Sequence, residues 1–138
     1  MGTKELFLVT GKYTKQLENG TFKRVSENFL IPAITFGEAE TKMFKHFENK
    51  TIGGQVNVTG MKRENFADLI LNGTDGEFFK AGVSYSTVDD KKIKVNFLVE
   101  SENIEKATES LTNYLQEKEY HSFQIVNLGV SQIVEVVE

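Results

Sequence analysis

The chain of 138 residues has no cysteine and only one proline. It can therefore form no disulfide and can use no thiolate as a nucleophile or metal ligand, and a reducing, cytoplasmic setting is expected. No apolar run approaches the roughly 20 residues that cross a bilayer, so we expect no membrane partner. The opening segment "MGTKELFLVTGKY" is apolar over too short a stretch to form the core of a signal peptide.

The sequence also contains fewer basic residues than acidic ones. Sixteen Lys and Arg stand against twenty Asp and Glu, which gives a net charge of −4. Proteins that bind duplex nucleic acid usually show the reverse balance, because their affinity comes from neutralising phosphates. We therefore expect no duplex nucleic acid as a partner, although a local basic patch is compatible with this composition.

Sequence patterns that carry chemistry are missing as well. The two histidines, His46 and His121, have no second histidine or carboxylate at metal-ligand spacing. There is no G-x-S-x-G segment for a nucleophilic serine, and no glycine-rich turn opens a helix to hold a nucleotide. We expect no catalytic residue, no metal and no cofactor, and hence a protein that is not an enzyme.

What the chain does contain is enough apolar material for one core. Hydrophobic residues make up 39% of the sequence, and eleven residues are phenylalanine. This composition is typical of a folded protein, and the length predicts a single domain over residues 1–138.

Two stretches of the chain share one outline. "FLIPAITFGEAETKMF" (29–44) and "FLVESENIEKATESLT" (97–112) align without a gap. The flanks align too: Glu5, Phe7 and Tyr13 with Glu77, Phe79 and Tyr85; Val56, Val58 and Met61 with Phe123, Ile125 and Leu128; 66–70 with 133–137. Apolar patterns can converge by chance, but a shared order of three elements favours an internal duplication.

Each repeat predicts strands around one amphipathic helix. Asn19-Gly20 is a strong hairpin signal, and Thr35 with Glu38 forms a T-x-x-E capping box at a helix start. Residues 66–71 are either a continuation of the preceding strand beyond a bulge or a fourth strand. The prediction is an α+β fold with internally duplicated ββαβ-type halves (3–71 and 77–138), mostly antiparallel sheet, two helices and a pseudo-twofold axis.

With segments such as "ITFGEAE" and "GMKRENF", the sequence resembles a small uncharacterised family common in Bacteroidetes and their phages. The resemblance covers nearly the whole chain. It implies the product of a phage or mobile-element gene, acting in the host cytoplasm, and it implies no activity.

The segment "GMKRENF" (60–66) also contains the candidate site. It places Lys62, Arg63 and Asn65 near a strand interruption, whereas the counterpart segment "NLGVSQI" has lost both cations. Arginine suits phosphate because its planar fork gives bidentate hydrogen bonds. The alternative is that both cations are solvated charges near Glu64.

Tyr13 and Tyr85 complete the candidate ligand-binding set. They occupy equivalent positions in the two predicted first strands. Either they pack in the core or across strands, or they offer an aromatic platform on which a base stacks.

Two functions of different classes follow from these patterns. The first is a non-enzymatic phage or mobile-element protein that sequesters a small phosphate-bearing, nucleotide-type immune signal. The alternative is a protein–protein interaction module, a phage accessory or host-takeover factor, that acts through an exposed sheet edge. We also expect a homo-oligomer, a dimer, because the apolar last strand "SQIVEVVE" (131–138) ends without a covering element.

Overall fold

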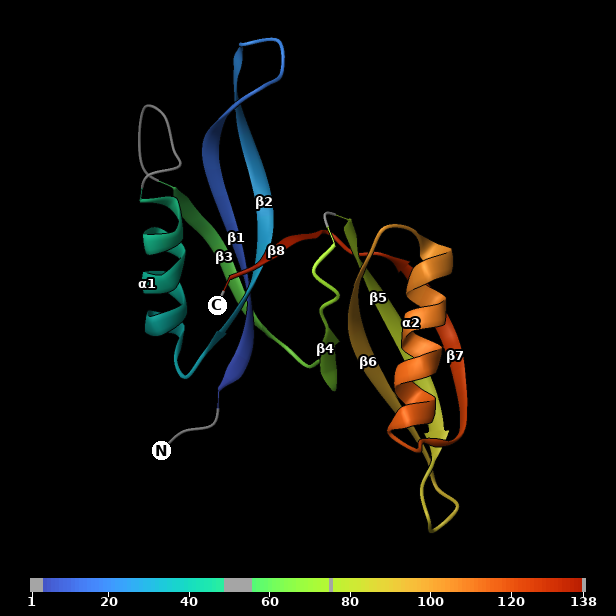
Figure 1. Ribbon diagram of the computed structural model, residues 1–138. Coiled ribbons are helices and arrows are strands. Elements are labelled where there is room, and N and C mark those ends of the chain that lie inside the picture. The colour runs from blue at the N-terminus through green and yellow to red at the C-terminus, as the bar shows by residue number, and fades with distance from the viewer. Residues whose placement is uncertain (1–3, 49–55, 75, 138) are drawn as a thin grey trace. The chain divides into compact units, whose positions relative to one another are not determined.

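The computed structural model of the protein describes residues 4–48, 56–74 and 76–137. Within them the chain forms two helices and eight strands, which confirms the predicted α+β class (Figure 1). In chain order the elements are β1 (Glu5–Gln16), β2 (Phe22–Ala33), α1 (Phe36–Phe47), β3 (Asn57–Glu64), β4 (Asp68–Ile70), β5 (Glu77–Ser86), β6 (Lys92–Ser101), α2 (Ile104–Glu117), β7 (His121–Val130) and β8 (Ile133–Val136). Neither of these described helices is long and apolar enough to cross a membrane.

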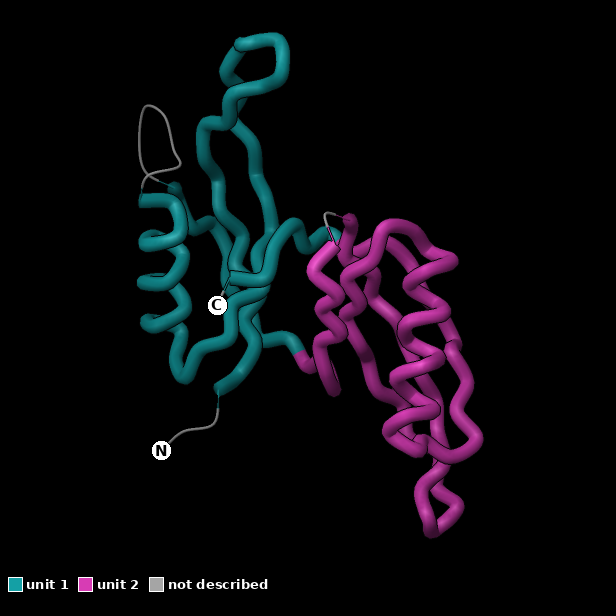
Figure 2. The backbone as a smooth tube through the Cα atoms, in the orientation of Figure 1, with its two compact units in different colours: residues 1–64, 132–138 teal, residues 65–131 magenta. Residues whose placement is uncertain are grey.

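The strands form two four-stranded sheets in two compact units (Figure 2). Unit 1 comprises residues 1–64 and 132–138 and has the strand order β3-β1-β2-β8. Unit 2 comprises residues 65–131 and has the order β4-β6-β5-β7. In each sheet the three long strands are antiparallel and the short fourth strand is parallel to its neighbour.

The compact units differ from the predicted repeats because the two halves exchange their last strands. Residues 66–71 do contain a fourth strand, β4, but it pairs with β6 of the second half. Reciprocally, β8 of the second half pairs with β2 of the first. Each unit is thus three strands and a helix from one half, completed by one short strand from the other.

The register of the ladders agrees with the predicted duplication. Phe7 lies opposite Ile31 in unit 1, and their counterparts Phe79 and Val99 lie opposite each other in unit 2. Both edge strands also carry one extra residue at the same point, Thr59 in β3 and Val126 in β7, which confirms the interruption predicted near Gly60.

Both hairpins turn in the same way. Leu17 N donates to Thr21 O over 2.7 Å, and Thr87 N donates to Lys91 O over 2.8 Å. The left-handed residue is Gly20, with φ of 85°, in the first turn. In the second turn that conformation falls on Asp90, which tolerates it better than most residues.

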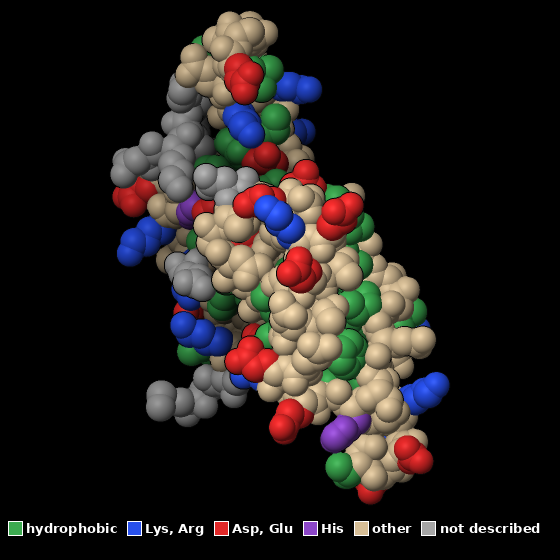
Figure 3. All heavy atoms as spheres, turned by 45° about the vertical axis from the view of Figure 1, so that its right-hand side comes forward, with side chains coloured by type: hydrophobic (Ala, Val, Ile, Leu, Met, Phe, Trp, Pro, Cys, Tyr) green, Lys and Arg blue, Asp and Glu red, His purple; other side chains and the backbone are tan. Residues whose placement is uncertain are grey.

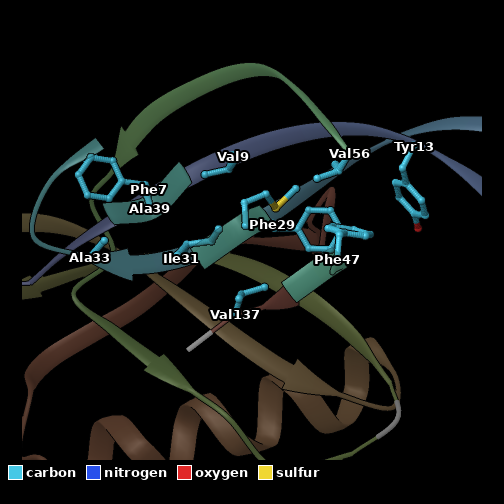
Figure 4. Close-up of a cluster of buried hydrophobic side chains, with 11 residues drawn as sticks. Phe7, Val9, Tyr13, Phe29, Ile31, Ala33, Ala39, Phe47, Val56 and Val137 are labelled. Atoms are coloured by element: carbon cyan, nitrogen blue, oxygen red, sulfur yellow. The ribbon is translucent and has the colours of Figure 1, made fainter. Parts of the chain in front are cut away.

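One helix covers one sheet face in each unit. Ala39, Met43 and Phe47 of α1 are buried, and so are their predicted counterparts Ala107, Leu111 and Leu115 of α2. In unit 1 these helix residues join a row of strand side chains that runs from Phe7 to Tyr13 (Figure 4). The spacing of four residues keeps the buried positions on one helix face, as the sequence pattern predicted.

The apolar last strand is not left uncovered. Ile133 and Val137 are 7% and 6% exposed, and Val137 belongs to the core cluster of unit 1. An uncovered last strand therefore no longer supports a dimer, because the rest of the chain already buries these two side chains. Self-association itself stays a prediction.

Candidate functional site

The two cations of the predicted site point to opposite faces of the sheet. Lys62 and Arg63 are consecutive residues of β3, and successive side chains of a strand alternate. Arg63 lies opposite Phe7, on the face that α1 covers, and Lys62 lies opposite Leu8. The two side chains therefore do not converge on one phosphate group.

Both cations also have acidic neighbours. Arg63 Nε donates to Glu5 Oε2 over 2.8 Å, and its guanidinium carbon lies 4.8 Å from the centre of the Phe36 ring. Lys62 Nζ lies 3.6 Å from Glu64 Oε1, the partner named in the alternative interpretation. More than half of each cationic side chain is exposed, so both pairs are surface interactions of small energy.

The remaining predicted residues lie apart from these cations. Asn65 is exposed and follows the end of β3. Tyr13 is buried near the far end of β1 in unit 1, whereas Tyr85 belongs to β5 of unit 2. No single site within either unit therefore contains all five predicted residues. One of them, Tyr13, lines a hollow that is distant from Lys62 and Arg63 along β1.

That hollow lies in unit 1, where the β1–β2 hairpin, the end of α1 and β8 meet. Its volume is about 510 Å³, within the range of small-molecule pockets. We call it the Tyr13 hollow. It is lined by Tyr13, Thr14, Lys15, Gln16, Glu27, Phe29, His46, Phe47, Val134 and Glu135.

Aromatic rings form much of its lining. Phe47 packs against Tyr13 at 4.6 Å between ring centres and edge-on against Phe29 at 5.3 Å. His46 lies 5.9 Å from Phe29 and 5.2 Å from Phe47. Figure 4 shows Tyr13, Phe29 and Phe47 together at one end of the core row. Such a packed group holds its rings in fixed orientations.

Polar groups on this lining come in pairs. The Tyr13 hydroxyl donates to Glu27, whose carboxylate also lies 3.6 Å from Lys15 Nζ. On the other wall, His46 Nε2 lies 3.3 Å from Glu135 Oε2. Burial, and then the hydrogen bond to Glu27, raise the pKa of Tyr13 well above its usual value. The phenol therefore stays protonated at neutral pH and serves as a hydrogen-bond donor.

The equivalent place in unit 2 is filled. Tyr120 packs edge-on against Tyr85 at 4.8 Å and contacts Phe97, the counterpart of Phe29, at 6.1 Å. Tyr114, which replaces His46, donates from its hydroxyl to Asp68 over 2.5 Å. The same scaffold thus carries an aromatic hollow in one unit and a packed tyrosine cluster in the other.

The charges of the Tyr13 hollow are mixed rather than basic. Glu27 and Glu135 oppose Lys15 and the imidazole of His46. On the face shown in Figure 3, Lys and Arg side chains occur singly or in small groups among acidic ones. Among residues 4–48, 56–74 and 76–137, no three His, Asp or Glu side chains lie together in a way that could hold a metal ion.

Sequence reasoning missed most of this lining. The predicted ligand-binding set contains Tyr13 but none of the other lining residues His46, Phe29, Phe47, Glu27 and Glu135. One signal was present in the sequence. When the two halves are aligned, His46 falls at the position of Tyr114, and Glu27 falls at the position of Val95. Polar residues confined to one half of a duplicated chain mark a place where the halves have diverged.

Comparison with known families gives one match. Residues 5–138 match the model of a family described as Domain of unknown function (DUF4494). No curated protein matches the chain.

Proposed function

Because the chain belongs to this family, whose description assigns no activity, we propose from its own geometry that it is a non-enzymatic protein that binds and sequesters a small nucleotide-type molecule in the Tyr13 hollow. The observation that carries the proposal is the aromatic lining beside fixed polar groups. Concave sites of this size with a few convergent polar atoms are the usual form of a ligand pocket.

The planar part of the ligand is expected to meet the aromatic lining. The Phe47 ring lies 4.6 Å from the Tyr13 ring and 5.3 Å from the Phe29 ring, between ring centres. Aromatic faces bind bases by stacking without a requirement for one sequence or one base. The carboxylates of Glu27 and Glu135, and the oxygen of Tyr13, whose proton is donated to Glu27, then supply acceptors for the polar edge of a base.

The charges of the lining limit how many phosphate groups the ligand can carry. Lys15, about half exposed at the rim, is the cation best placed to contact a phosphate. Glu27 and Glu135 repel further negative charge. We therefore expect a ligand with one phosphate to bind more tightly than one with two, and we place phosphate recognition at Lys15 rather than at Lys62 and Arg63.

Sequestration of an immune signal is the biological setting that we propose. The resemblance of the sequence to proteins of Bacteroidetes and their phages supports an origin in a phage or other mobile element. A protein that captures a signal stoichiometrically in the host cytoplasm needs a pocket and no catalytic group, and these are the demands that the Tyr13 hollow can meet.

A tryptophan at position 134 tests the site. Val134 lines the Tyr13 hollow and is 45% exposed, so Val134→Trp should fill the hollow without disturbing the core. The matched control is Ala67→Trp, since Ala67 is the exposed counterpart in unit 2. Calorimetry with cyclic mononucleotides, cyclic dinucleotides, cyclic ADP-ribose isomers and unphosphorylated nucleosides measures the binding.

We expect the wild type and Ala67→Trp to bind alike, and Val134→Trp to bind at least about tenfold more weakly, because a filled hollow loses its contacts. If both tryptophan variants bind like the wild type, the ligand site lies elsewhere. If a folded wild-type protein binds none of these compounds, the proposal fails, and the interaction-module alternative gains weight.

One observation favours that alternative. The edge strand β7 carries no charged side chain that would hinder pairing with another strand.

A further inference from the structure

Strand β7 forms one edge of the sheet in unit 2. The strand order β4-β6-β5-β7 leaves its outer side unpaired among the described strands. Its sequence, HSFQIVNLGV, contains no Lys, Arg, Asp, Glu or Pro. Edge strands usually carry such residues, because the free N–H and C=O groups of an edge otherwise invite a further strand.

The duplicated half supplies a direct comparison. Strand β3 occupies the equivalent edge in unit 1 and ends in Lys62, Arg63 and Glu64. By the ladder positions, Gly129 and Val130 stand where Lys62 and Arg63 stand in β3. Both edges keep the one-residue bulge, but only the β3 edge also carries charge, so β7 lacks one of the two features that discourage a further strand.

Two apolar side chains of β7 are exposed, and one of them, Val130, stands at the position of Arg63. Val130 is 64% exposed and Val126 is 49% exposed. In unit 1 the Arg63 guanidinium lies over Phe36, which is still 41% exposed. Its counterpart in unit 2, Ile104, is 48% exposed.

We propose that the occupant of this edge is a second copy of the chain, whose β7 pairs antiparallel with the first across a twofold axis. In such a pair each strand faces its own sequence, so any charge near the axis would meet its like charge. A strand without charge escapes this repulsion, even in a chain of net charge −4. The same neutrality offers nothing to select a charged peptide from a foreign partner.

The extra residue Val126 places an apolar side chain near the middle of the pair. It lies close to the centre of β7 (His121–Val130), so a twofold axis through the strand brings it near its own copy. The site differs from the last strand, whose side chains Ile133 and Val137 are buried within unit 1. The pairing of β7 also leaves the Tyr13 hollow unchanged, since that hollow is built from unit 1 alone.

A single cysteine tests the pairing cleanly, because the chain has none of its own. Val126→Cys should form a disulfide-linked dimer under mild oxidation, and Thr59→Cys, at the equivalent point of β3, should not. Equal cross-linking of the two variants, or none at Val126→Cys, would overturn the proposal.

The second test places a charge near the axis. Light scattering from micromolar to near-millimolar protein should show a wild-type dimer. Val126→Lys should weaken it at least about tenfold, because the lysine of each copy then lies near that of the other. Val126 is exposed, so folding should persist, and circular dichroism checks it. A monomeric wild type, or a dimer that this cation leaves intact, contradicts the proposal.

Discussion

At the scale of single residues, one tyrosine in each unit donates a hydrogen bond to a carboxylate. Tyr13 donates to Glu27 in unit 1, and Tyr114 donates to Asp68 in unit 2. For both hydroxyls, burial is the main reason that the pKa is raised, and the carboxylate adds to it. The folded protein therefore holds these two protons at a pH where an unfolded chain has released them.

The consequence is a loss of stability in alkali. An unfolded tyrosine loses its proton near pH 10, so above that pH the folded state binds more protons than the unfolded state. The stabilisation is complete below about pH 9 and falls as the pH rises beyond about 10. Tyr114→Phe should flatten this fall in urea unfolding measured at successive pH values.

Asp68→Asn serves as the matched control for that variant. It removes the carboxylate but leaves the phenol partly buried, and burial is the larger cause of the raised pKa of Tyr114. Most of the alkaline loss should therefore remain in Asp68→Asn. If Tyr114→Phe shows the same alkaline profile as the wild type, the buried phenol is not responsible.

Residue contacts within the site were the least predictable from sequence. Arg63, a candidate phosphate ligand in the sequence, donates to Glu5, which lies far away in the chain and comes close only through the pairing of β1 with β3. The walls of the Tyr13 hollow likewise come from β1, α1 and β8. No local pattern in the sequence reveals that Tyr13, His46 and Glu135 share one surface.

At the scale of elements, local rules predicted much more. Glu38 N donates to the Thr35 hydroxyl over 3.1 Å, which confirms the predicted helix start. At the start of α2, Lys106 N donates to the Asn103 side chain over 2.8 Å. The capping box closes through the preceding residue, since Ile34 N donates to Glu38 over 2.9 Å. Caps and hairpin turns depend on neighbours in the chain, which is why the sequence reveals them.

The cap of α1 gives a prediction at this scale. Thr35→Ala removes the acceptor for Glu38 N and should lower the free energy of unfolding by about 1 kcal/mol, whereas Thr35→Ser keeps the hydroxyl and should lose much less. Denaturant unfolding monitored by circular dichroism measures both. Equal losses for alanine and serine would show that the methyl group of Thr35, rather than its hydroxyl, stabilises the helix start.

At the scale of the whole molecule, the repeat was predictable and the exchange of strands was not. The pattern of apolar residues in 66–70 and 133–137 indicates a strand in each half, but the same pattern suits either sheet. β4 and β8 are short, and each pairs with the second strand of the opposite half. That the chain is a single domain over 1–138 stays a prediction.

Deletion of residues 132–138 tests whether the two units unfold independently. Unit 1 loses β8 and the buried side chains Ile133 and Val137, whereas unit 2 keeps all four of its strands. Hydrogen exchange should speed up for the amides of β1 and β2 and stay slow in β5 and β6. Equal loss of protection in both sheets would indicate that the two units unfold together, as one domain does.

The exchange of strands also sets the order in which the two units can be completed during translation. Unit 2 is one unbroken stretch of chain, so all of its strands are available once Ser131 has left the exit tunnel. Unit 1 begins first but must wait for residues synthesised after the whole of unit 2. The side of β2 that receives β8 therefore has no partner strand until β8 has been synthesised. β8 then completes the sheet of the unit whose first strands were made before any of unit 2.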